Sequence, residues 1–177
     1  MGDELDKLAE EIDAVCRLTG EFTLRSGLVV TEYFDKYRFE SRPDLLRQVA
    51  QAMVPLLPPN TQALGGLELG GVPIATTVGA LTGIPALFVR KEAKRYGTMR
   101  LAEGGDVDGV RVALIEDVIT TGGAVQNAAI ALRELGAHVD AVICAIDRSQ
   151  PGMNTLDSIG LTTKSVLTKK MLDAHRR

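Results

Sequence analysis

Two apolar runs constrain the fold of this chain more than any other feature. Residues 110–115 and 139–146 are apolar at nearly every position and lack the alternation of a strand with one face in water. Such runs are typical of strands in the middle of a parallel sheet, where helices cover both faces. The sequence therefore predicts an α/β protein with helices on both sides of a central parallel sheet.

Further strand and helix patterns alternate along the chain. Short strands are expected at 63–66 and 86–89, and a helix at 73–82 lies between them. Another helix follows the first long apolar run and ends before Gly136, which is suited to a helix C-cap. Repeated strand–helix units form one parallel sheet and no linker interrupts them, so a single domain is expected over 1–177.

The N-terminal part is predicted to stand apart from this sheet. Apolar residues at helical spacing indicate an amphipathic helix that ends near Gly20. Residues 21–41 contain β-forming residues and three of the four phenylalanines, which indicates short strands and turns in a small flap. Pro43 then opens a helix, which Pro55 and two later prolines end.

Composition narrows the class of protein. The chain has 177 residues, of which 45% are hydrophobic, so it can bury a sizeable core. No apolar run is long enough to cross a bilayer and the first ten residues show no signal-peptide pattern, so a cytoplasmic protein is expected. Cys16 and Cys144 lie in apolar segments and are expected to be buried, reduced thiols. The net charge of −3 argues against a general attraction to nucleic acid.

Positive charge is concentrated in one short segment. Glu92 is the only acidic residue within it, and its five cations are Arg90, Lys91, Lys94, Arg95 and Arg100. A local basic loop on an acidic protein suggests a small anionic ligand rather than a long polyanion. From charge alone, a solvated surface run is favoured.

The segment from Val112 to Ala124 carries the clearest chemical information. A buried strand is expected to end in two adjacent carboxylates, Glu116 and Asp117, and a turn with two threonines and two glycines then opens a helix. In open α/β sheets, ligands bind at the carboxyl ends of the strands. Unpaired backbone N–H groups at a helix N-terminus suit a phosphate, and glycines let the backbone approach it closely.

The two carboxylates exclude a simple phosphate cradle, because they would repel the phosphate. They fit sugar hydroxyls, or a metal ion that bridges to phosphate. A ligand with a 5-phosphate, ribose hydroxyls and a magnesium-bound diphosphate satisfies both halves of the segment. The alternative is a helix N-cap preceded by two solvated acids. The turn lacks the Gly-Lys-Ser/Thr ending of a nucleotide-triphosphate P-loop.

Glu116–Ala124 resembles the phosphoribosyl-diphosphate signature of the type I phosphoribosyltransferases. Within that family, four further segments resemble parts of the orotate phosphoribosyltransferases. Residues 88–97 resemble the mobile catalytic loop and 65–76 the loop beside the diphosphate, while 145–150 resemble the Asp-Arg strand end and 22–27 the start of the hood. The matches follow the family's order and span most of the chain.

This resemblance implies the type I phosphoribosyltransferase fold, with a small N-terminal hood at about 20–42. It implies transfer of the phosphoribosyl group of 5-phospho-α-D-ribose 1-diphosphate to orotate, which yields orotidine 5′-phosphate and diphosphate in UMP biosynthesis. Mg²⁺ is the implied cofactor, bound through the diphosphate near Glu116 and Asp117. A homodimer is implied, with a mobile loop at 90–108 shared between subunits. No nucleic-acid or membrane partner is expected.

The same resemblance assigns roles to individual residues. Lys94 and Asp117 are the implied catalytic residues. Thr120 and Arg148 are implied to bind orotate, and a guanidinium suits bidentate recognition of the orotate carboxylate. The residues implied to bind phosphoribosyl diphosphate are Arg90, Lys91, Lys94, Tyr96, Glu116, Asp117, Val118, Ile119, Thr120, Thr121, Gly122, Gly123 and Ala124.

The sequence departs from the family pattern at three places. Tyr96 stands where many members have histidine, although a phenol can still donate a hydrogen bond. Leu69 and Gly70 stand where some members have a Tyr-Lys pair. Arg25 stands where those relatives have a hood lysine.

Two other functions remain open at this stage. One is a phosphoribosyltransferase for purine bases, against which Arg148 favours a carboxylated pyrimidine. The other is a regulator that binds nucleotide or phosphoribosyl diphosphate and controls transcription through RNA. Such a regulator needs a basic face, and none is evident outside 90–100. Neither His138 nor His175 is expected to be catalytic.

Overall fold

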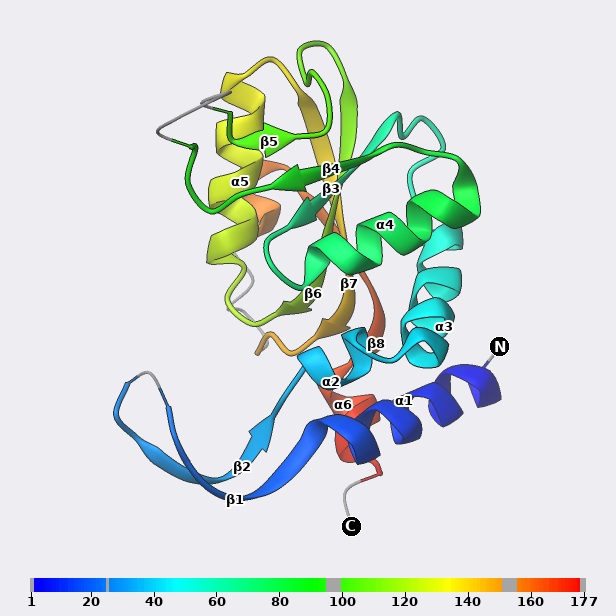
Figure 1. Cartoon of the computed structure of the whole chain (residues 1–177), viewed down its shortest axis with the longest axis vertical. Coiled ribbons are helices and arrows are strands. Elements are labelled where there is room, and N and C mark those ends of the chain that lie inside the picture. The colour runs from blue at the N-terminus through cyan, green and yellow to red at the C-terminus, as the bar shows by residue number, and fades with distance from the viewer. Residues whose placement is uncertain (1, 25, 95–99, 151–155, 176–177) are drawn as a thin grey trace.

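The computed structural model describes residues 2–24, 26–94, 100–150 and 156–175. Within them, the main sheet has six strands in the order β5-β4-β3-β6-β7-β8 (Figure 1). Neighbouring strands are parallel except at one edge, where β5 runs antiparallel to β4. The strands are β3 (Ala63–Leu67), β4 (Ala86–Val89), β5 (Ala102–Glu103), β6 (Arg111–Ile119), β7 (His138–Asp147) and β8 (Thr162–Thr168).

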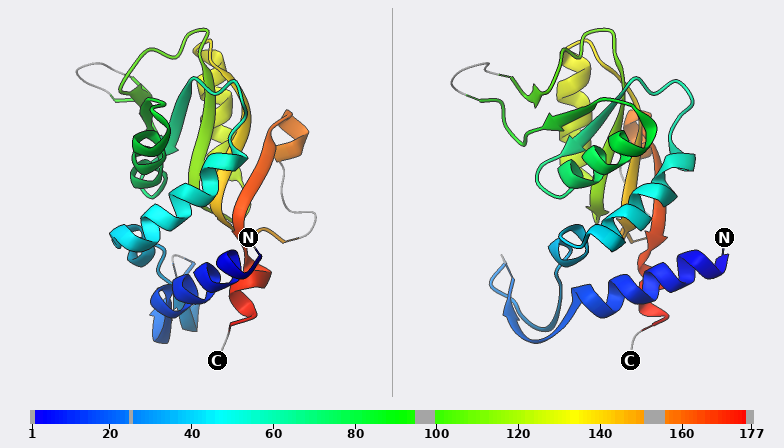
Figure 2. Two further views of the ribbon diagram at one scale, coloured as in Figure 1. Left: turned by 90° about the vertical axis from the view of Figure 1, so that its right-hand side faces the viewer. Right: turned by 45° about the vertical axis from the view of Figure 1, so that its right-hand side comes forward.

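Helices cover both faces of this sheet (Figure 2). Residues of α1, α3 and α4 share one buried cluster with the sheet, and residues of α5 and η2 share the other. The helices are α1 (Gly2–Cys16), α2 (Tyr37–Glu40), α3 (Pro43–Met53), α4 (Gly71–Thr82), α5 (Gly123–Glu134) and α6 (Lys169–Asp173), with 3-10 turns η1 (Val54–Leu56) and η2 (Leu156–Ile159).

The central strand β6 explains why the apolar runs have no polar face. Ala113 and Ile115 belong to the cluster with α3 and α4, whereas Val112 and Leu114 belong to the cluster with α5. All four are almost fully buried, since successive side chains of a strand point to opposite faces and both faces are covered. The predicted parallel sheet with helices on both sides is confirmed.

The N-terminal segment differs from the prediction. α1 ends at Cys16 rather than near Gly20, and the next residues form β1 (Arg17–Thr23). β1 pairs antiparallel with β2 (Val29–Phe34) in a hairpin that projects from the body of the molecule (Figure 1). The boundary moves because this segment contains a glycine, which is unfavourable in a helix, and threonine and phenylalanine, which favour strands.

Arg17 fixes the base of this hairpin. Its guanidinium lies 2.7 Å from Asp13 of α1, 3.1 Å from Asp173 of α6 and 3.4 Å from Glu32 of β2. The side chain is mostly buried and donates hydrogen bonds to all three carboxylates. Arg17 therefore joins the hairpin to two helices that are far apart in the sequence.

Two elements near the C-terminus were not predicted. β8 forms the other edge of the sheet beside β7, and α6 packs against α1. Both cysteines are buried free thiols, as expected. In the part of the chain that the structure describes, no helix combines the length and apolarity needed to span a bilayer.

Candidate active site

The turn between β6 and α5 has the geometry of a phosphate site. Gly122 has a φ of +80°, and a Cβ at this position would lie 3.0 Å from the side chain of Leu156. Both the left-handed backbone and the close approach require glycine. α5 begins at Gly123, so its first backbone N–H groups have no carbonyl partner within the helix. Groups of this kind bind anions well.

A pocket of about 240 Å³ lies at this turn. It is lined by Lys36, Tyr37, Glu68, Leu69, Lys91, Glu116, Val118, Ile119, Thr120, Thr121, Gly122, Gly123, Ala124 and Val125. The structure thus brings Lys91 together with Glu116 and with residues 118–124, all singled out in the sequence. It adds Lys36 and Tyr37 from the segment that follows the hairpin.

The two adjacent carboxylates lie inside β6, not at its end. Glu116 is opposite Cys144 of β7, and the pairing continues to Ile119 opposite Asp147. The strand was expected to end in the two carboxylates, but it continues to Ile119 because β7 runs on beside it and pairs with Val118 and Ile119. Glu116 is 8% exposed and Asp117 is fully buried.

Burial and mutual contact set the charge of this pair. Burial raises the pKa of Glu116 well above its ordinary value, and the hydrogen bond with Asp117 raises it further. Burial also opposes ionisation of Asp117, but hydrogen bonds from Glu116 and Lys36 hold the pKa of Asp117 below its ordinary value. Of the two carboxyls, Asp117 is the one that its surroundings favour in the ionised form.

Two charged residues that the sequence analysis missed complete the cluster. Lys36 Nζ lies 2.5 Å from Asp117 Oδ2. Glu40 is 7% exposed, and its buried Oε1 has no hydrogen-bond partner. Burial and the adjacent Asp117 raise the pKa of Glu40 to about 8. In the sequence, both belong to a run of alternating charges at 35–42 that resembles a solvated surface.

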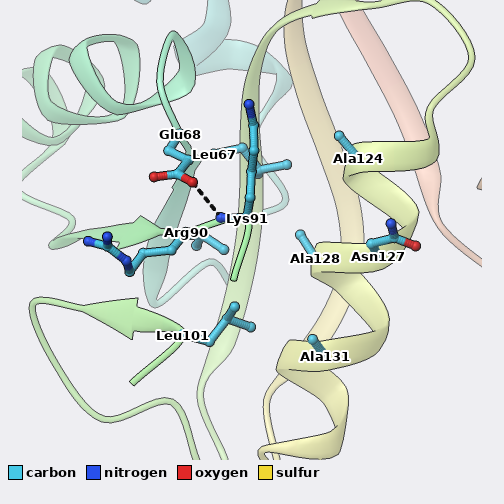
Figure 3. Close-up of a pocket in the computed structure, with 10 residues that line it drawn as sticks. Leu67, Glu68, Arg90, Lys91, Leu101, Ala124, Asn127, Ala128 and Ala131 are labelled. Carbon is cyan, nitrogen blue, oxygen red and sulfur yellow. Dashed lines mark hydrogen bonds between the residues drawn. The ribbon is translucent and has the colours of Figure 1, made fainter. Parts of the chain in front are cut away.

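The segment after β3 forms the opposite wall of the pocket. Glu68 Oε1 accepts a 2.7 Å hydrogen bond from the backbone N–H of Lys91, which joins this wall to the segment after β4 (Figure 3). Figure 3 shows Lys91 extending toward the level of Ala124 at the start of α5, whereas Arg90 points away from α5. Arg90 Nε is buried without a hydrogen-bond partner.

A second pocket of about 350 Å³ adjoins the first, with which it shares Glu68, Lys91 and Ala124. Its walls are mainly apolar, with Leu67, Val89 and Leu101 on the strand side and Ala124, Ala128 and Ala131 on α5 (Figure 3). The opening beside the phosphate turn therefore continues along α5.

Among the described residues of the basic segment, Arg90 lines the second pocket with Lys91, whereas Lys94 and Arg100 line neither pocket. Lys94 lies 2.5 Å from Glu103 Oε1 of β5, so this cation has an acidic partner that the charge pattern did not indicate. Tyr96 and Arg95 lie outside the described residues, as does Arg25.

Arg148 directly follows β7 and lies next to the hairpin. Its backbone N–H donates a 2.8 Å hydrogen bond to the carbonyl of Ile119, which places it beside the phosphate turn. The guanidinium carbon lies 5.0 Å from the ring centre of Phe34, the last residue of β2. Burial lowers the pKa of Arg148 from its ordinary value, but an arginine remains charged.

The carboxylates near the phosphate turn do not form a metal centre by themselves. Among residues 2–24, 26–94, 100–150 and 156–175, no group of three or more His, Cys, Asp or Glu side chains is arranged to hold one directly. Glu116 and Asp117 nevertheless offer carboxylate oxygens beside a phosphate turn. Such donors suit Mg²⁺ that takes most of its ligands from phosphates and water.

A mainly parallel sheet with a buried carboxylate pair, a phosphate turn and an adjacent hairpin defines a phosphoribosyltransferase of type I. Comparison with known proteins narrows this class. An orotate phosphoribosyltransferase from a Nocardioides species is 67% identical over 169 residues, which cover 96% of this chain and 94% of the relative. The chain belongs to the orotate phosphoribosyltransferase family.

Solved structures agree with this assignment, although no family model matches the chain. A crystal structure of the Mycobacterium tuberculosis orotate phosphoribosyltransferase has a TM-score of 0.82 at 32% identity and covers 96% of this chain and 98% of its own. A second structure of that enzyme, in complex with 5-phospho-α-D-ribosyl 1-diphosphate, has a TM-score of 0.79 at 29% identity, with 96% and 99% covered.

Proposed function

We propose that this protein transfers the phosphoribosyl group of 5-phospho-α-D-ribose 1-diphosphate to orotate, with release of diphosphate and formation of orotidine 5′-phosphate. One observation carries the proposal: the phosphate turn, the buried pair Glu116 and Asp117, and the backbone of Arg148 lie at the same end of the sheet. These groups match the phosphate, the ribose hydroxyls and the carboxylate of the two substrates. Membership of the family supports the same reaction.

The 5-phosphate would bind at the turn from Thr120 to Ala124. The N–H groups at the start of α5 donate to phosphate oxygens, and the hydroxyls of Thr120 and Thr121, both exposed, can add to them. Val118 and Ile119 line the same pocket and have no polar side chains, so they would shape the phosphate site without bonding the phosphate through their side chains. A phosphate held here anchors the sugar over the end of β6.

The ribose hydroxyls would lie against Glu116 and Asp117. A protonated Glu116 can donate a hydrogen bond and an ionised Asp117 can accept one, so the pair offers complementary partners to a diol. Mg²⁺ bound to the diphosphate would neutralise part of the charge that develops as the diphosphate leaves. Asp117, kept ionised, would stabilise positive charge on the ribose in a transition state of oxocarbenium character.

The diphosphate would lie between the Glu68–Leu69 wall and the basic segment. Lys91 lines the pocket, and Arg90 and Lys94 are close to Lys91 in the sequence. The resemblance to the family alone assigns Tyr96 a hydrogen bond to the diphosphate. Lys94 is the proposed catalytic residue, because a cation that meets charge on the leaving group stabilises the transition state more than the ground state.

Orotate would bind between Thr120 and Arg148. The Arg148 guanidinium packs on Phe34 and can donate two parallel hydrogen bonds to a carboxylate. The ring nitrogen of orotate can lose its proton without a strong protein base. Exposed His138 is at the start of β7, the opposite end of the strands from the turn, and His175 lies 3.0 Å from Asp6; neither is assigned a role.

Assembly and location complete the proposal. We infer a homodimer in which residues 90–108 are shared between subunits, and a single domain over 1–177 with a hood at about 20–42. A cytoplasmic enzyme is proposed, with no nucleic-acid or membrane partner.

The decisive experiment measures diphosphate release from phosphoribosyl diphosphate and Mg²⁺ with different bases. Release is expected with orotate and should be far slower with uracil, which lacks the carboxylate, and with adenine or hypoxanthine. Equal rates with orotate and uracil would show that Arg148 does not bind the orotate carboxylate. If only a purine base supported release, the protein would be a purine phosphoribosyltransferase and the proposed reaction would be wrong.

A further inference from the structure

Lys36 occupies a position that joins the hairpin to the phosphate pocket. It lies between the end of β2 and the start of α2, and it lines the pocket. Its side chain is 33% exposed, while its partner Asp117 is completely buried. The ammonium therefore stands at the boundary between a buried carboxylate and the space where a ligand would bind.

The pocket contains few positive charges for the ligand that it is proposed to take. Among the lining residues, Lys36 and Lys91 are the cations, whereas Glu68 and Glu116 are acidic. A sugar that bears a phosphate and a diphosphate is highly anionic, so each cation in the lining matters. The wall formed by Glu68, Leu69 and Gly70 supplies none.

Gly70 makes room for the arrangement around Lys36. A Cβ on Gly70 would lie 1.6 Å from Asp117 Oδ2 and 2.7 Å from Glu40 Oε1. Both distances are far inside van der Waals contact, so no side chain fits at position 70 while Asp117 keeps its place. A cation for this side of the pocket cannot come from residue 70, and the side chain that reaches the same carboxylate oxygen is Lys36.

One ammonium group can serve both a carboxylate and a ligand. It carries three N–H donors, and it forms an ion pair with Asp117 at 2.5 Å. Tyr37 adds an aromatic ring whose centre lies 5.4 Å from Lys36 Nζ, which favours a cation at this point. The partial exposure of the lysine leaves a side of the ammonium open to the pocket.

We propose that Lys36 binds phosphoribosyl diphosphate in this site. Its ammonium would bridge the Asp117 carboxylate and the diphosphate of that substrate. This inference rests on the proposed function, since it names a further contact for the same donor. The segment that follows the hairpin would thereby supply a charged group to the diphosphate side of the pocket.

The test uses calorimetry with phosphoribosyl diphosphate and Mg²⁺, inorganic diphosphate and Mg²⁺, and ribose 5-phosphate. Lys36→Met should weaken binding of the first two ligands about 10- to 100-fold, the range for a lost charge-assisted hydrogen bond. Ribose 5-phosphate, which lacks the diphosphate, should bind the variant as it binds the parent protein. Lys36→Arg should recover part of the lost affinity, and Lys7→Met is the control at an exposed lysine on α1.

A double-mutant cycle with Asp117→Asn separates a direct contact from an effect through Asp117. In the Asp117→Asn background no buried carboxylate loses its partner, so this comparison also serves if Lys36→Met alone does not fold. A direct contact predicts that Lys36→Met still weakens diphosphate binding there. Loss of the effect in that background would overturn the proposal, as would unchanged diphosphate binding in a folded variant or equal weakening of ribose 5-phosphate. Failure of the unaltered protein to bind phosphoribosyl diphosphate would instead overturn the proposed function.

Discussion

Lys94 forms an ion pair with Glu103, the last residue of β5, with its ammonium 2.5 Å from a carboxylate oxygen. Both side chains are about one quarter exposed. The lysine proposed to meet the leaving diphosphate is therefore held at β5. In the proposed role its ammonium would exchange Glu103 for the diphosphate.

The first prediction concerns Lys94. Lys94→Ala should lower turnover strongly with little change in thermal stability, because a partly exposed ion pair contributes only about 0–1 kcal/mol to folding. Steady-state kinetics and a melting curve test both parts.

If the segment that contains Lys94 acts on the neighbouring subunit, mixing Lys94→Ala protein with Asp117→Asn protein should restore activity. In a mixed dimer one site then carries both changes and the other neither. Absence of recovery after demonstrated subunit exchange would mean that the loop serves its own subunit.

The second prediction concerns Arg148. Arg148→Ala should raise the Michaelis constant for orotate, with a loss of roughly 1.5–3 kcal/mol for a charge-assisted hydrogen bond. The Michaelis constant for the donor should change much less, because Arg148 does not line the phosphate pocket. Unchanged orotate kinetics in a folded variant would exclude the carboxylate contact.

The third prediction separates the two glycines of the phosphate turn. Gly122→Ala should lower the free energy of unfolding by about 1–2 kcal/mol, because an L-residue is strained in the left-handed region. Gly123→Val should affect folding less, since the nearest atom to a Cβ there is Thr121 Oγ1 at 3.9 Å. Its added methyl groups should instead weaken donor binding. Denaturation and calorimetry of both variants give the comparison, and normal donor affinity of Gly123→Val would remove this residue from the site.

The fourth prediction concerns the pH dependence of stability. The pKa of Glu40 is about 8 in the folded protein, against an ordinary value of 4.5. Between these values the folded state holds a proton that the unfolded state has lost, so stability should fall as pH rises from about 4.5 to 8. Burial is the largest cause of this raised pKa; Asp117 and Asp35 raise it further, and Lys36 lowers it.

Glu40→Gln should make the melting temperature less sensitive to pH over this range, because glutamine has no proton to lose. Glu116 has a raised pKa of the same sign, so the slope should decrease without vanishing. Melting curves at several pH values, with Glu11→Gln on the surface of α1 as the control, test this. An identical slope in Glu40→Gln and the parent protein would show that Glu40 ionises normally.

The sheet could be predicted from sequence because its central strands are buried on two sides. Residues 110–115 and 139–146 leave no polar face to place in water, which excludes most other folds. β8 escaped notice because its segment Thr162–Thr168 has only Val166 and Leu167 as large apolar residues. An edge strand needs no more than this.

The candidate site was predicted where its chemistry is contiguous in the chain. Glu116 to Ala124 contains carboxylates, hydroxyls and glycines in one segment, so its function is visible without tertiary structure. Lys36 and Glu40 were missed because their partner, Asp117, is about 80 residues away and only the fold brings them together. Their burial depends on Gly70 and β6, and no local pattern contains that information.

The contacts of Arg17 also bear on how the chain matures during synthesis. Asp13 and Glu32 leave the ribosome close to Arg17, but Asp173 follows 156 residues later. Until α6 emerges, the base of the hairpin lacks one of its three anionic partners and the helix that packs on α1. The phosphate turn can form earlier, because β6, β7 and α5 are complete once residue 147 is made. A nascent chain should therefore acquire its phosphate-binding turn before the orientation of its hairpin is set.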